Sequence, residues 1–97
     1  MAVLLYARAM GINFWWARND GMSGHAWLSV DDLRAIVDEM RAQGVQWDPG
    51  RKEVNAVAID DALRDLASEP RTYVDPKLWA DWLGFLGGAA ENGGLVI

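Results

Sequence analysis

The amino-acid sequence predicts an α+β fold: a small antiparallel or mixed sheet, built from N-terminal strands and a C-terminal strand, with about three helices packed on one face. Two observations support this. Short runs rich in aromatic and apolar residues occupy the first thirty residues and the last four, and amphipathic segments with helical spacing lie between them. With 97 residues and 52% hydrophobic side chains, residues 1–97 have the size and composition of a single globular domain.

The first thirty residues contain three predicted strands. AVLLYARA, residues 2–9, is a short apolar run typical of a strand covered on both faces. The glycine and asparagine of MGIN, residues 10–13, predict a turn. The aromatic segment FWWAR, residues 14–18, predicts a second strand. HAWLSV, residues 25–30, predicts a third strand or an extended lead into the helix that follows. The Asn-Asp-Gly sequence between these two segments indicates the connecting turn.

The clearest boundary in the sequence is the start of the first helix, which we expect over residues 30–43. Ser29 is a typical N-cap, and two aspartates in the first turn suit the positive end of the helix dipole. Hydrophobic residues recur at helical spacing from Val30 to Met40. Gly44 stands where a helix-ending glycine is usual.

A second helix is predicted over residues 53–69, EVNAVAIDDALRDLASE, and Pro70 ends it. Its apolar stripe consists of Val54, Ala58, Leu63 and Leu66.

A third helix begins at Asp75-Pro76, because Asp is a capping residue and Pro fits the first helical position. Its main apolar face consists of Leu78, Trp82, Phe85, Leu86 and Ala89. Trp79 lies on the flank of this face and is a candidate for exposure. The glycines at positions 84, 87 and 88 indicate the close approach of a neighbouring element or a weakened helix end. GLVI, residues 94–97, predicts the last strand.

The net charge of −5, from 14 acidic and nine basic residues, bears on the partners of the protein. Nucleic-acid binding needs clustered Lys and Arg, and the sequence has no basic stripe, so we expect no nucleic-acid partner. An anionic membrane surface is disfavoured for the same reason, and no segment is typical of a signal peptide or a membrane span. A basic protein partner is favoured, although modest acidity also serves solubility alone.

The absence of cysteine excludes disulfides, thiolate metal sites and thiol nucleophiles. Small secreted domains usually carry disulfides, so the sequence favours the cytoplasm. With a single histidine and no calcium-loop or P-loop spacing, we expect neither a metal nor a cofactor.

A catalytic role has little support in the sequence. His25 is the only histidine, and no G-x-S-x-G motif surrounds the serines near it. The paired aspartates at 31–32 and 60–61 point in different directions on their predicted helices, so neither pair converges on one substrate atom. The sequence therefore favours a protein that is not an enzyme.

Six tryptophans are hard to bury in one small core. Trp15 and Trp16 are adjacent in a predicted strand, so their side chains point to opposite faces of the sheet. Trp27 on the next strand is able to pair across with one of them. If helices cover only one face, at least one of these indoles is exposed, and exposed Trp is enriched in protein interfaces. The alternative is a second covering layer that buries every tryptophan.

Two hypotheses of different kinds follow. The first is a small cytosolic protein-protein interaction module that binds a protein partner or a second copy of itself; an acidic inhibitor or immunity-type protein would fit its size and charge. Its binding residues would be Trp15, Trp16 and Trp27, with Trp79 and Trp82 if the third helix is partly exposed. The alternative is a small-molecule-binding protein or minor enzyme, with a pocket that uses Arg18, Asp20 and His25.

Overall fold

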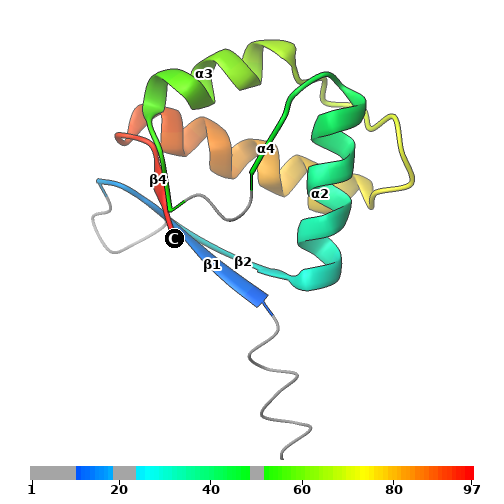
Figure 1. The fold of residues 1–97 in the computed structure, drawn as a ribbon, viewed down its shortest axis with the longest axis horizontal. Helices are drawn as coiled ribbons and strands as arrows, with labels where there is room; N and C mark the ends of the chain where they lie inside the picture. The colour runs from blue at the N-terminus through cyan, green and yellow to red at the C-terminus, as the bar shows by residue number, and fades with distance from the viewer. Residues whose placement is uncertain (1–10, 19–23, 49–51) are drawn as a thin grey trace, which may run out of the picture.

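The part of the chain that the structure describes folds as a four-stranded antiparallel sheet with three helices on one of its faces (Figure 1). The computed structural model describes residues 11–18, 24–48 and 52–97. The elements in chain order are β1 (Gly11–Trp16), β2 (His25–Ser29), α2 (Val30–Ala42), β3 (Glu53–Val54), α3 (Ala56–Asp65), α4 (Pro76–Glu91) and β4 (Leu95–Val96). The strand order is β2-β1-β4-β3, and each neighbouring pair is antiparallel. The predicted α+β class is therefore confirmed, while the strand predicted over residues 2–9 lies outside the described residues.

The hydrophobic core lies between the inner face of the sheet and the helices. Side chains of a strand alternate between its two faces, and Phe14 of β1, Leu28 of β2 and Leu95 of β4 are all buried on the helix side. Trp82 of α4 meets Phe14 edge to face, with ring centroids 5.3 Å apart. Trp82 also stacks on Phe85 of the same helix, at a centroid distance of 5.7 Å. Aromatic side chains thus join the central strand to α4.

The turn predicted over residues 10–13 is wrong in its described part, because β1 already begins at Gly11. Gly11 has a steric role instead. A Cβ atom on Gly11 would collide with the indole of Trp27, which lies over it. β1 ends at Trp16, two residues earlier than predicted, and β2 ends one residue earlier than predicted. The two strands otherwise occupy the predicted segments.

The first predicted helix is confirmed as α2, which ends one residue before its expected end. The Oγ of Ser29 accepts a hydrogen bond from the backbone N–H of Asp32 at 3.1 Å, as an N-cap should. Gly44 follows the helix with a φ of 89°, a conformation that other residues rarely adopt. Local capping signals therefore set both ends of this helix.

The second predicted helix is shorter than expected, and its first residues form a strand. Glu53–Val54 pairs with β4 as β3. Asn55 caps α3 instead, because its Oδ1 accepts a hydrogen bond from the N–H of Ala58 at 2.8 Å. The helix ends four residues earlier than predicted. The predicted stripe is also corrected: Ile59, which is not in it, is fully buried, whereas Ala58 is exposed.

The third predicted helix is confirmed as α4, with Asp75 as its cap and Pro76 as its first residue. The predicted exposure of Trp79 is wrong, because this side chain is 0% exposed. Its Nε1 donates to the backbone C=O of Ala67 at 2.9 Å, so the connection from α3 covers this flank. The predicted last strand is confirmed as β4. No helix among the described residues is long and apolar enough to cross a membrane.

A buried carboxylate on α2 holds the connection between α3 and α4. Glu39 accepts hydrogen bonds of 2.7–3.0 Å from the backbone N–H groups of Arg71 and Thr72, the hydroxyl of Thr72 and the side-chain amide of Gln43. Burial by itself raises the pKa of Glu39, but these hydrogen bonds to the charged form together lower the pKa to about 2. The Oε1 of Gln43 accepts from the N–H of Ala67 at 2.6 Å. The connection is therefore fixed to α2 at two points.

Candidate functional site

The outer face of the sheet, which turns away from the helices, carries exposed aromatic side chains. The alternation that buries Phe14 in β1 directs Trp15 outward, and the alternation that buries Leu28 in β2 directs Trp27 outward. Trp15 is 40% exposed and Trp27 is 49% exposed. We call this surface the aromatic face, and it consists of Gly11, Asn13, Trp15, His25, Trp27, Glu53 and Val96.

Trp15 lies in a row of residues that crosses all four strands. It is directly opposite His25 on β2 and opposite Val96 on β4. Val96 in turn is opposite Glu53 on β3. Direct cross-strand neighbours pack against one another, so Trp15 has support from both sides of its own strand. This support fixes the position of the exposed indole.

Trp15 and His25 pack ring against ring. Their centroids are 4.1 Å apart and their planes are inclined by 35°. The next pair along the strands is hydrogen-bonded, because the N–H of Trp16 donates to the C=O of Gly24 at 2.8 Å. Trp15 and His25 therefore form a non-hydrogen-bonded pair, in which side chains approach most closely. The Nε2 of His25 lies 2.7 Å from Oδ1 of Asn13, and it donates to that oxygen in the tautomer with hydrogen on Nε2. The imidazole is therefore held between an indole and an amide.

Trp27 leans diagonally from β2 across β1. Its register partner is Asn13, but its indole covers Gly11 at the start of β1. An aromatic side chain that covers a glycine of a neighbouring strand stabilises the sheet. Because both exposed indoles are already fixed by neighbours, a partner that binds them has little side-chain entropy to remove.

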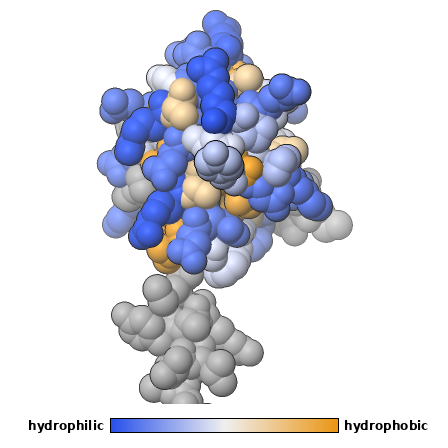
Figure 2. Space-filling view, turned by 90° about the vertical axis from the view of Figure 1, so that its right-hand side faces the viewer, coloured by the Kyte–Doolittle hydropathy of each residue, from blue (hydrophilic) through white to orange (hydrophobic). Residues whose placement is uncertain are grey.

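The aromatic face is poor in charge, although the chain as a whole carries −5. Glu53, at the end of the row, is the only charged residue among its members. Ion pairs of the described residues lie on the helices, such as Arg64–Asp60 on α3 and Lys77–Asp81 on α4. On the side of the molecule where α2 and the α3–α4 connection lie, the surface is mostly hydrophilic (Figure 2). These ion pairs of the described residues thus lie away from the aromatic face.

Three of the predicted binding tryptophans do not belong to the aromatic face. Trp16 points inward and is half-buried: its Nε1 donates to the C=O of Phe85 at 3.0 Å, and its ring fills the space over Gly88. The glycine at position 88 therefore allows the indole of Trp16 to approach α4 closely, which is one of the two explanations predicted for the glycines of this helix. Trp79 and Trp82 are 0% and 2% exposed. Trp79 and Trp82 were expected to bind a partner only if α4 exposed them, and α4 buries both side chains.

Of the three residues of the alternative pocket, the structure describes Arg18 and His25. Arg18 is exposed after the end of β1, where its backbone N–H donates to the C=O of Asn92 at 2.8 Å and its side chain lies beside Gly93. His25 lies on the aromatic face, and Asp20 lies outside the described residues. Three pockets whose lining consists of described residues include neither Arg18 nor His25. Within the described ranges, no group of three or more His, Asp or Glu is placed to hold a metal ion.

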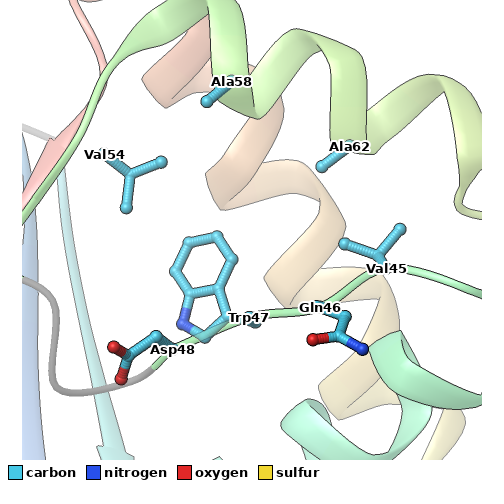
Figure 3. Close-up of a pocket in the computed structure, with 7 residues that line it drawn as sticks. All are labelled: Val45, Gln46, Trp47, Asp48, Val54, Ala58 and Ala62. Carbon is cyan, nitrogen blue, oxygen red and sulfur yellow. The ribbon is translucent and has the colours of Figure 1, made fainter.

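A small pocket lies elsewhere, between the segment that follows α2 and the helix α3 (Figure 3). It is lined by Val45, Gln46, Trp47, Asp48, Val54, Ala58 and Ala62, and its volume is about 100 Å³. The Nε1 of Trp47 is buried and has no hydrogen-bond partner among the residues that the structure describes. Because that atom is closed to solvent, a pocket occupant does not reach it. The pocket is smaller than the roughly 150 Å³ apolar cavity that binds benzene, so it has room for a few atoms only.

Comparison with family models, with curated proteins and with solved structures gives no match for this chain.

Two residues of structural weight are missed by reasoning from the sequence. The neighbouring glycine predicts a turn for Asn13, which contacts His25, although its spacing of two from Trp15 indicates a shared strand face. Glu39 was not singled out, because a glutamate in an amphipathic helix usually faces solvent. Gln43 one turn later is the only local sign of a polar cluster.

Proposed function

We propose that this protein is a small protein-protein interaction module whose aromatic face binds a protein partner. The observation that carries the proposal is the exposure of Trp15 and Trp27 on one face of the sheet, by 40% and 49% of their surfaces. Tryptophan is enriched among the residues that dominate binding energy. Exposed large apolar side chains that gather on one face also mark interaction surfaces more than singly scattered ones do.

The character of the aromatic face indicates the chemistry of the partner. Glu53 is its only charged member, so apolar area and shape rather than ion pairs would provide most of the contact. His25 and Asn13 add hydrogen-bonding groups beside the indoles. The acidic remainder of the chain favours a partner whose apolar contact is surrounded by basic residues. We place the module in the cytoplasm, because small secreted proteins usually carry disulfides and this chain has no cysteine. An inhibitor or immunity-type role fits its size and acidity.

The test is affinity capture from a lysate of the source cell, with the natural chain beside Trp15→Ala and Trp27→Ala, read by mass spectrometry. Tyr73→Ala is the matched control, because Tyr73 is a fully exposed aromatic residue on the α3–α4 connection, away from the aromatic face. Circular dichroism verifies that each variant is folded.

We expect one protein to be captured by the natural chain and by Tyr73→Ala, and to be lost with both tryptophan variants. Capture that survives both tryptophan substitutions would contradict the proposal, as would the absence of any specific partner.

A further inference from the structure

β2 is an edge strand with outward-pointing backbone groups. It stands at one end of the order β2-β1-β4-β3. The hydrogen bond from the N–H of Trp16 to the C=O of Gly24, together with the register of the pair, directs the backbone groups of Ala26 and Leu28 toward β1. The N–H and C=O groups of His25 and Trp27 and the N–H of Ser29 therefore point away from the sheet. The C=O of Ser29, the N-cap residue, accepts the first hydrogen bond of α2 instead. Among the described residues, no strand pairs with this side of β2.

This edge lacks the features that usually prevent strand pairing. Natural edge strands carry Pro, Lys or other charges, or a bulge. The sequence of β2, HAWLS, contains no proline and no lysine, aspartate, glutamate or arginine. Its register with β1 runs without a bulge from Gly11–Ser29 to Trp15–His25. An edge of this kind is suited to receive another strand.

We propose that β2 pairs in antiparallel fashion with β2 of a second copy of this chain, with Trp27 on the two-fold axis. The outward groups are spaced symmetrically about position 27. In this register the two Trp27 residues exchange a pair of N–H···O=C hydrogen bonds, and the N–H of Ser29 donates to the C=O of His25 of the second copy. A contact in which one strand complements itself is the usual basis of a symmetric dimer.

The side chains and charges of β2 are compatible with this pairing. The indole of Trp27 leans over Gly11 of β1, away from the free edge, and so leaves the outward backbone groups of β2 accessible. β2 contains no Asp, Glu, Lys or Arg, which keeps the net charge of −5 from acting directly across the contact. The two sheets would become one, and Trp15 and Trp27 of both copies would share a single outer surface. The inference goes beyond the proposed function, because it concerns the edge of the sheet rather than its face.

The first test is amide hydrogen exchange by NMR on the full chain, combined with sedimentation velocity at the same concentration. The amides of Ala26 and Leu28 point to β1 and serve as internal controls that exchange slowly in either case. We expect a dimer in which the amides of Trp27 and Ser29 are also protected, and in which that protection falls on dilution. Fast exchange at these two positions, or protection in a species that sediments as a monomer, would overturn the proposal.

The second test uses three variants. Trp27→Lys places like charges directly opposite each other on the axis, so we expect a folded monomer or at least a tenfold weaker dimer. Trp27→Phe keeps an uncharged aromatic side chain there, and Trp15→Ala removes the face without touching the edge; both should remain dimeric. A dimer as strong in Trp27→Lys as in the natural chain would contradict the pairing. Trp15→Ala distinguishes the two proposals. Loss of the dimer in Trp27→Lys alone bears on the edge pairing, whereas loss of a captured partner in Trp15→Ala, with its dimer intact, bears on the aromatic face.

Discussion

Trp15 and His25, on neighbouring strands, stack with ring centroids 4.1 Å apart, and both side chains are exposed to solvent. The sheet therefore uses its two faces differently. The inner face contributes Phe14 and Leu95 to the core, and the outer face presents aromatic rings that no described element covers. Aromatic surface that contributes little to the core is available for binding.

The division between exposed and buried tryptophans predicts very different costs of truncation. Trp79→Ala should lower the free energy of unfolding by about 3–5 kcal/mol, because it leaves a large cavity and an unpaired C=O at Ala67. Trp15→Ala should cost about 1 kcal/mol, mainly through the lost stacking on His25. Urea denaturation measures both values. Equal losses would mean that Trp15 is a core residue.

Two glycines of α4 should respond oppositely to alanine. Gly88→Ala places a Cβ against the indole of Trp16 and should lower the free energy of unfolding by about 1–3 kcal/mol. Gly84→Ala meets no atom within 4 Å and should raise it by about 0.5–1 kcal/mol, since alanine is the better helix former. Thermal denaturation of the two variants measures both changes in the free energy of unfolding. A stabilised Gly88→Ala would show that Trp16 does not pack there.

Glu39→Gln should destabilise the protein through the α3–α4 connection. The backbone N–H groups of Arg71 and Thr72 donate to the carboxylate of Glu39. In the variant, the side-chain NH₂ group cannot accept a hydrogen bond, so at least one buried donor loses its acceptor, at a cost of about 1–3 kcal/mol. Glu69→Gln, an exposed change in the same connection, is the control and should cost less than about 0.5 kcal/mol. Equal urea midpoints for the two variants would rule out the role given to Glu39.

The low pKa of Glu39 predicts a specific loss of stability in acid. The folded-state pKa of about 2 lies below the ordinary value of 4.5, so the charged form stabilises the fold fully above about pH 5. This contribution is lost as the pH falls from about 5 to 2, and it amounts to about 3 kcal/mol. The free energy of unfolding should fall more steeply over this range in the natural chain than in Glu39→Gln. Parallel curves would contradict the assigned pKa.

The parts of the fold that the sequence predicts are those that local chemistry determines. Ser29 and Asp75 cap helices through hydrogen bonds to residues two or three positions away, and such signals are readable in one dimension. The helical pattern extends across Glu53–Val54, which is a strand, because Asn55 is the actual cap of α3. The start of β1 is not evident from the sequence because glycine is typical of turns. Gly11 lies in a strand because the indole of Trp27 covers it and leaves no room for a Cβ atom.

The candidate site was predictable in part, for a related reason. Strand alternation alone places Trp15 and Trp16 on opposite faces, and only the packing decides which of them points outward. The burial of Trp79 depends on the connection at Ala67, 12 residues earlier in the chain. The partners of Glu39 are 32 and 33 residues away. No pattern within a helical turn carries information on contacts of that separation.

The most direct test of the central claim, that the aromatic face binds a protein, is isothermal titration of the captured partner with purified variants. The account predicts that Trp15→Ala and Trp27→Ala each weaken binding by at least about 30-fold, the size of a hot-spot loss of 2 kcal/mol, while Tyr73→Ala leaves the affinity unchanged. An affinity that falls in Tyr73→Ala and survives in both tryptophan variants would place the binding surface on the α3–α4 connection and contradict the claim.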